Sequence, residues 1–176
     1  MREENEVLLS AYHEAAHAVF AHHDDTDVDN VCISSEQGNC AIRCADLYER
    51  YMPWRYAQFC LAGAYAAAVA ADLEHPKPEE VPLSWLLAEA ERTPEGDAWF
   101  AVEALKRVAK RDTIFDSVGK VYAFAMLELA GLVEERWDEI EAIAFALYQR
   151  WAESEEDVGR IDGDEMPQII EHMRGE

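Results

Sequence analysis

The chain has few basic residues for its size. It carries 15 Lys and Arg against 37 Asp and Glu in 176 residues, which gives a formal net charge of −22. A field of that sign repels phosphate backbones and anionic membrane surfaces, so we expect no nucleic-acid partner. The same field favours solubility and attracts basic peptides and metal ions.

A secretory leader and long apolar runs are also missing. The first residues, Met1 to Glu6, are acidic, and no apolar segment follows them. The longest uncharged run extends from Tyr56 to Ala71 and is rich in alanine. It is shorter than the roughly 20 apolar residues of a transmembrane helix. We therefore expect a buried helix here, no membrane insertion and a cytoplasmic location.

Cysteine and glycine are sparse as well. The four cysteines are too few for a disulfide scaffold. Cys40 and Cys44 lack the close two-residue spacing that is typical of structural zinc sites. A thiolate metal site that also uses Cys32 and Cys60 stays open as an alternative, but small buried side chains are the favoured interpretation. No glycine-rich phosphate loop is present.

Hydrophobic periodicity predicts a mainly α, single domain over residues 1–176, with a small two- or three-stranded β element. We divide it into a metal-site part, 1–112, and a C-terminal helical part, 113–176. Strands are expected at 31–33 and 40–44, around a turn at Gly38-Asn39. Helices are expected at 6–22, at 53–73 before His75-Pro76-Lys77-Pro78, after Pro82, from Thr93-Pro94 to 111, at 116–130 before a stop at Gly131, at 133–151 and from about 164.

The first helix carries His13-Glu14-Ala15-Ala16-His17. Residues four apart lie on one helix face, so His13 and His17 can share a metal ion. Glu14 then lies beside that ion, where its carboxylate can take a proton from bound water. Two alternatives stay open, namely a chance pattern and a zinc site without catalysis.

Asp97 is the best candidate for a third ligand. It falls on the apolar stripe of its helix, where an unpaired carboxylate is costly and a metal ion supplies a partner. The alternative is an ordinary first-turn anion that the helix dipole favours. Lower-ranked candidates, all at expected helix ends, are His22, His23, Asp72, Glu74 and His75.

The stretch Ala11-Tyr12-His13-Glu14-Ala15-Ala16-His17-Ala18 resembles the peptidase domain of the FtsH-type AAA+ zinc metalloproteases, which reads Ala-Tyr-His-Glu-Ala-Gly-His-Ala. Three shorter matches follow in order. They are Val31-Cys32-Ile33-Ser34, Leu61-Ala62-Gly63 and Arg160-Ile161-Asp162-Gly163-Asp164-Glu165. Gly96-Asp97 lies where that family has its third ligand. The resemblance implies a zincin-like fold, Zn²⁺ held by His13, His17 and Asp97, and Glu14 as the catalytic base.

The sequence departs from the family at three places. Ala16 replaces a glycine, Ala67-Ala68 replace two glutamates, and Glu95-Gly96 replace Ser-Asn. There is no ATPase module, so we expect that unfolding of folded substrates is not intrinsic to this chain. A separate ATPase partner and a homo-oligomer stay open.

The function we expect is zinc-dependent endopeptidase activity on unfolded polypeptides or peptides. The expected strand at Cys40–Cys44 is a candidate edge that pairs with an extended substrate. The alternative function is a non-catalytic, zinc-containing binding or adaptor module that keeps the peptidase fold.

Overall fold

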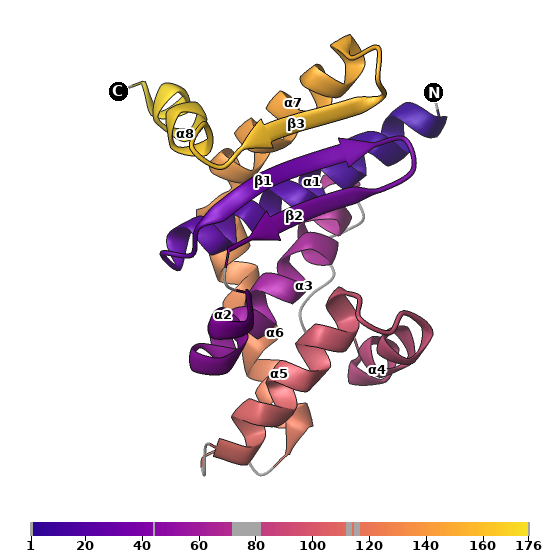
Figure 1. Ribbon diagram of the computed structural model, residues 1–176. Helices are drawn as coiled ribbons and strands as arrows, with labels where there is room; N and C mark the ends of the chain where they lie inside the picture. Colours follow the sequence, from indigo (N-terminus) through magenta and orange to yellow (C-terminus); the bar gives the residue numbers. More distant parts are fainter. Residues whose placement is uncertain (1, 44, 72–81, 112–113, 115–116, 176) are drawn as a thin grey trace.

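A computed structural model describes residues 2–43, 45–71, 82–111, 114 and 117–175. It is mainly helical, with one three-stranded antiparallel sheet (Figure 1). The elements in chain order are α1 (Arg2–His23), β1 (Val28–Ser34), β2 (Gly38–Ile42), α2 (Ala45–Tyr51), α3 (Pro53–Ala70), α4 (Leu83–Arg92), α5 (Asp97–Arg111), α6 (Val118–Glu135), α7 (Trp137–Glu153), β3 (Val158–Asp162) and α8 (Met166–Arg174).

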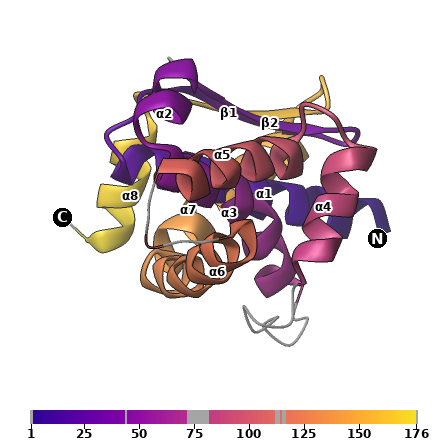
Figure 2. The ribbon, with the colours of Figure 1, turned by 90° about the horizontal axis from the view of Figure 1, so that it is seen from below.

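Helix α1 lies at the centre of the fold. The sheet covers one side of it, and α3 and α7 pack on its remaining sides (Figures 1 and 2). Ala11, Ala15 and Ala18 of α1 have no exposed surface. Because these side chains are small, neighbouring backbones approach α1 closely from several directions. Together with Val19, these residues recur at helical spacing and form the core-facing side of α1.

The sheet has the strand order β2-β1-β3, so β1 is central and β2 is an edge strand. Val31 of β1 lies opposite Cys40 of β2 and Ile161 of β3. Both predicted strands exist. The turn at Gly38-Asn39 was wrong, because these residues already belong to β2. Its place is taken by Ser35–Gln37, where the Ser34 hydroxyl accepts the Gln37 N–H at 3.1 Å.

The start of α5 differs from the expectation. Thr93-Pro94 does not begin the helix, because Thr93 ends α4 and its hydroxyl donates to the Glu89 carbonyl at 2.9 Å. Glu95 then adopts a left-handed backbone with φ 64°, which separates the two helices. Helix α5 begins at Asp97, so the apolar stripe of Ala101, Ala104, Leu105 and Val108 is still buried as predicted.

Helix α6 also differs from the expectation. The predicted stop at Gly131 is wrong, because α6 continues through it to Glu135 and α7 starts only at Trp137. A glycine in a helix interior costs only about 1 kcal/mol, and the packing of Leu129 and Val133 on either side of it decides the outcome.

Several smaller boundaries shift. Helix α1 starts at Arg2, the sequence patterns missed α2, and α8 starts at Met166. The buried helix predicted from the uncharged run is confirmed as α3, in which ten residues are buried. Some expected boundaries lie outside the described residues. They are the end of a helix at Leu73, the stop signal at His75–Pro78, the end of a strand at Cys44 and the start of a helix at Asp116. Across the described part of the chain, no helix is long and apolar enough to cross a membrane.

Candidate metal centre

Two helices bring the three predicted ligands together. On α1, His13 and His17 are one turn apart, and their Nε2 atoms lie 3.0 Å from each other. Asp97, the first residue of α5, places Oδ2 at 2.9 Å from the His13 nitrogen and 3.1 Å from the His17 nitrogen. Residues 80 positions apart in the chain thus form a compact triangle of one oxygen and two nitrogens.

The orientation of the His17 ring directs the Nε2 atom into this triangle. His17 is almost fully buried, and its Nδ1 lies 2.7 Å from the Phe59 carbonyl of α3. Since a carbonyl only accepts, Nδ1 carries the proton and donates it. In the neutral ring, Nε2 is then an unprotonated acceptor that faces Asp97 and the nitrogen of His13. Such an arrangement needs a cation, either a proton or a metal ion.

The charges around the triangle favour positive charge there. Burial alone would lower the pKa of His17, but the Asp97 carboxylate and Glu14 together raise it to about 9. Burial would likewise raise the pKa of Asp97, yet the two histidines hold it well below its usual range. Both shifts follow from the attraction between the carboxylates and a proton on the histidines, and a divalent cation bound at the triangle would take the place of that proton.

The triangle fits the ligand set of a catalytic zinc site. Donors at 2.0–2.1 Å from a tetrahedral ion lie roughly 3.3 Å from one another, close to the spacing of the three atoms in this structure. The side chains of His13 and Asp97 are 27% and 44% exposed, so the triangle can be reached from solvent. Two histidines and a carboxylate leave a fourth position for water. The Nδ1 bond to Phe59 supplies the outer-shell hydrogen bond that zinc-binding histidines generally make.

Glu14 lies next to these ligands and is buried, with 7% of its surface exposed. It projects toward the edge strand, since a Cβ placed on Gly38 would come within 2.6 Å of its carboxylate. Burial raises the pKa of Glu14, His17 and His13 work against that rise, and Asp97 adds to it. A carboxylate with a raised pKa beside a metal is suited to accept and return a proton.

Gly63 of α3 allows the two histidines to converge. A Cβ at this position would lie 2.5 Å from Nε2 of His17 and 2.6 Å from Nε2 of His13. Helix α3 therefore needs a residue without a side chain where it passes the ligands. The sequence contained a hint, since Gly63 belongs to one of the motifs that resemble the FtsH-type peptidases, but only the packing shows its role.

Comparison with known proteins gives no further identification. Neither the protein-family models nor the curated proteins gave a match to this chain.

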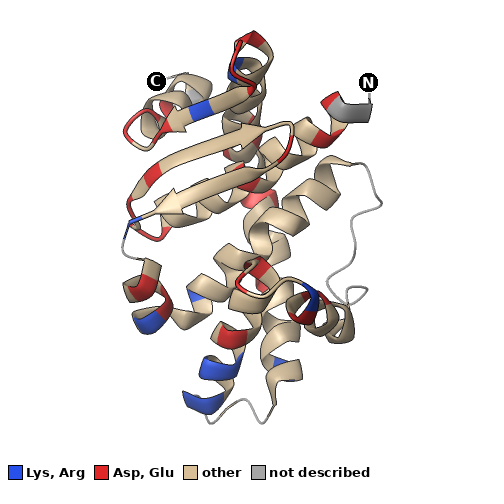
Figure 3. Ribbon diagram, turned by 45° about the vertical axis from the view of Figure 1, so that its right-hand side comes forward, with Lys and Arg blue, Asp and Glu red and all other residues tan. Residues whose placement is uncertain are grey.

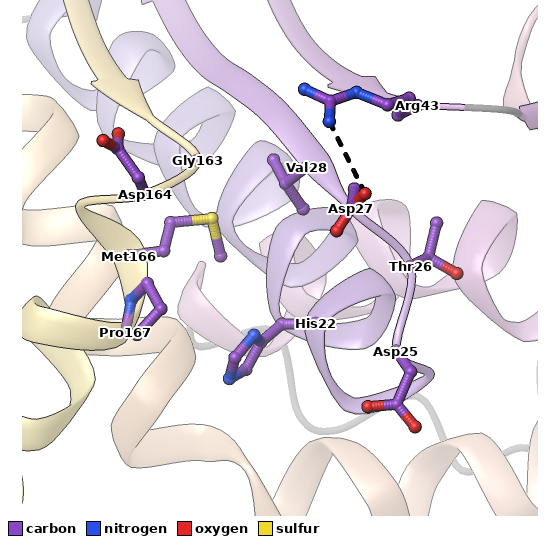
Figure 4. Close-up of a pocket in the computed structure, with 10 residues that line it drawn as sticks. All are labelled: His22, Asp25, Thr26, Asp27, Val28, Arg43, Gly163, Asp164, Met166 and Pro167. Carbon is purple, nitrogen blue, oxygen red and sulfur yellow. Dashed lines mark ion pairs between the residues drawn. The ribbon is translucent and has the colours of Figure 1, made fainter.

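The remaining histidine candidates do not join the triangle. His23 pairs through Nε2 with the buried Glu139 of α7 at 2.8 Å. His22 lines a separate cavity of about 410 Å³ between the end of α1 and the β3–α8 loop, where Arg43 and Asp27 form an ion pair at 3.6 Å (Figure 4). Asp72, Glu74 and His75 lie outside the described residues.

The three described cysteines are not members of the ligand group. Cys60 is buried, and Cys32 and Cys40 are partly buried free thiols. Burial raises the pKa of Cys40, and the nearby carboxylates Glu14 and Asp97 raise it further. A thiol with a raised pKa is a poor thiolate ligand, which agrees with the interpretation of these residues as small packing groups. Cys44 lies outside the described residues.

Proposed function

We propose that the protein is a zinc-dependent endopeptidase with a zincin-like fold similar to that of the FtsH-type peptidases. The observation that carries this proposal is the convergence of His13, His17 and Asp97 beside the buried carboxylate of Glu14. The carboxylate that both histidines contact comes from a helix 80 residues away, and this convergence supports a shared cation over a chance pattern on one helix.

In this proposal His13, His17 and Asp97 would hold a Zn²⁺ ion, which would supply Lewis-acid chemistry that makes water more acidic and polarises the scissile carbonyl. Glu14 takes a proton from that water and passes it to the leaving amine. His17 is held by Phe59 in the tautomer that presents Nε2. Asp97 completes the ligand set and offsets part of the positive charge.

The edge strand β2 supports a binding mode for the substrate. It pairs with β1 on one side, and its residue Gly38 adjoins Glu14. An extended peptide that adds to the free side of β2 would pass the proposed metal site. Alternate backbone N-methylation of a peptide substrate should slow its cleavage strongly, and unchanged cleavage of such peptides would rule out strand addition.

The experiment combines metal analysis with a cleavage assay on an unfolded protein such as casein. We expect one zinc per chain in the wild type and in Glu14→Gln. Turnover should fall by at least about 10²-fold in Glu14→Gln, because the proton acceptor is lost. Removal of zinc by a chelator should abolish cleavage, and added zinc should restore it.

The outcomes separate this proposal from its alternative. Zinc binding without any turnover would favour the non-catalytic zinc-containing module, which the alanines at positions 67 and 68 make a real alternative. Absence of zinc would overturn both assignments. A separate ATPase partner and a cytoplasmic location are further parts of the proposal that copurification and fractionation test.

A further inference from the structure

A second cavity adjoins the metal-ligand triangle. It has a volume of about 290 Å³, and His13 and Asp97 form part of its wall. The rest of the wall comes from α3, α4, the loop between α4 and α5, and Ala98 of α5. A group bound at the triangle would therefore border this cavity.

Most of the cavity wall is apolar. Leu61 of α3 and Leu86 of α4 are buried, with 8% and 1% of their surface exposed. Trp85 of α4 is half-exposed and adds its ring to the wall. Ala64 of α3 also lines the cavity and is exposed, so its short side chain leaves space in front of it.

The polar groups of the wall are already engaged. Glu89 accepts two hydrogen bonds from the Arg92 guanidinium, at 3.0 and 2.5 Å. The Thr93 hydroxyl donates to the Glu89 carbonyl. Two carboxylates, Glu89 and Asp97, border the cavity, and no Lys or Arg is among its described lining residues. An acidic side chain in this cavity would face these two carboxylates without a lining Lys or Arg to pair with, so its burial would be costly.

We propose that this cavity is a specificity pocket for an apolar substrate side chain, of the size of leucine or methionine, next to the cleaved bond. The proposal rests on the proposed peptidase function and adds the substrate preference. Because His13 and Asp97 belong both to the ligand triangle and to the cavity wall, a peptide whose carbonyl reaches the triangle carries a neighbouring side chain to the cavity. A volume near the lower limit for ligand pockets suits one side chain better than a whole small molecule.

The first test compares peptides that differ at one residue beside the cleaved bond. We expect leucine to be cleaved at least about tenfold faster than alanine, in terms of kcat/KM, and aspartate to be the poorest. Trp85→Ala should reduce the leucine-to-alanine ratio by removing part of the wall. Ala64→Leu should fill the cavity and favour alanine. Leu87→Ala is the matched control, because Leu87 lies on the same helix but not in the cavity wall.

A second test does not need turnover. The probes are the hydroxamates of acetyl-leucine and acetyl-glycine, which chelate zinc, and their binding to the zinc-loaded protein is measured by calorimetry. The leucine probe should bind about tenfold more tightly to the wild type and to Glu14→Gln. That difference should disappear in Trp85→Ala and Ala64→Leu but persist in Leu87→Ala.

The results of these tests can overturn the specificity pocket and the peptidase function separately. Equal affinities of the two probes for a zinc-loaded wild type, or an unchanged ratio in both pocket variants, would overturn the specificity pocket while leaving the peptidase intact. Bound zinc and a leucine preference without Glu14-dependent turnover would overturn the peptidase and support the pocket as a binding site. A protein that binds no zinc would overturn both.

Discussion

Two glycines give the side chains of the candidate metal centre the space that they occupy. Gly63 and Gly38 leave the space that the histidine nitrogens and the Glu14 carboxylate occupy. Gly38 lies on β2 and Gly63 on α3, so neither belongs to the helix that carries the motif. The arrangement of His13, Glu14 and His17 thus depends on two positions that have no side chain.

Replacement of Gly63 by alanine should reduce zinc affinity by about 10- to 100-fold, the effect expected when the support of a metal ligand is disturbed. The added Cβ would displace Nε2 of both histidines, whose side chains can move away without unfolding the helix. Competition with a chromophoric chelator measures the affinity. Gly119→Ala, where the nearest atom lies 3.7 Å from the new Cβ, is the control. Equal zinc affinity in the two variants would contradict the proposed role of Gly63.

Glu165 provides a test of pH dependence away from the site. Hydrogen bonds from Arg150 and from the Asp162 N–H lower its pKa to about 2. A carboxylate with a lowered folded pKa stabilises the protein above its unfolded pKa of about 4.3, and that contribution is lost as the pH falls through the folded value. The pair is exposed, so the contribution at pH 7 should be below about 1 kcal/mol.

Glu165→Gln should therefore unfold at a lower urea concentration than the wild type at pH 7 and pH 5. The difference should shrink below about pH 4.3 and vanish near pH 2. Glu171→Gln removes an equal charge at an exposed position of α8 and serves as the control. A difference between Glu165→Gln and wild type that stays constant across this range would show that the hydrogen bonds do not lower the pKa.

At the scale of whole helices, the buried face of α5 was predictable from the sequence, but its first residue was not. The stripe of α5 was predictable, because Ala101, Ala104, Leu105 and Val108 recur at helical spacing. Its first residue was not, since Thr93-Pro94 has the form of a helix start but serves as the end of α4. The left-handed Glu95 and the following Gly96 shift the start of α5 to Asp97, which turns the candidate ligand into the first residue of the helix.

The glycine inside α6 gives a prediction for a whole helix. Gly131→Ala should stabilise the protein by about 0.5–1 kcal/mol, because alanine loses less conformational entropy and no atom lies within 4 Å of the new Cβ. Urea unfolding measures the change. Gly163→Ala should do the opposite, since its Cβ would overlap the Val28 carbonyl oxygen at 1.7 Å. A loss of stability in Gly131→Ala would show that α6 does not continue through this position.

The molecule as a unit is strongly acidic, but its few basic residues are unevenly placed. Lys106, Arg107, Lys110 and Arg111 lie toward the C-terminal end of α5, visible as blue segments beside the grey trace in Figure 3. Asp97 lies at the opposite end, about 20 Å away along a helix of this length. The end of α5 that carries the candidate metal centre is thus remote from these basic residues.

This asymmetry predicts a salt-dependent substrate preference. A peptide with basic residues around a leucine should be cleaved several-fold faster than a matched acidic peptide at low salt. The ratio of kcat/KM should fall toward one between about 0.1 M and 1 M salt, as the Debye length falls from roughly 10 Å to 3 Å. Equal cleavage of both peptides at low salt would show that the net charge plays no part in substrate selection.

The sequence by itself determined the local features of this protein. The spacing of His13 and His17 places both rings on one face, because backbone hydrogen bonds within a helix impose that geometry. The uncharged run from Tyr56 to Ala71 and the stripe of α5 similarly predicted buried helices, and the alternation around Val31 predicted a strand. These properties depend on neighbours within a few residues.

Only the tertiary structure decided which residues meet. Asp97 reaches the histidines because α3 packs between α1 and α5 and because Gly63 lets α3 pass the ligands closely. Strand β3 completes the sheet beside β1, more than 120 residues later in the chain. Contacts of this range depend on the total packing of the core, which no short pattern specifies. The motif on α1 was therefore predictable, and Asp97 could be named as a candidate third ligand. Its convergence with the two histidines and the neighbouring pocket required the fold.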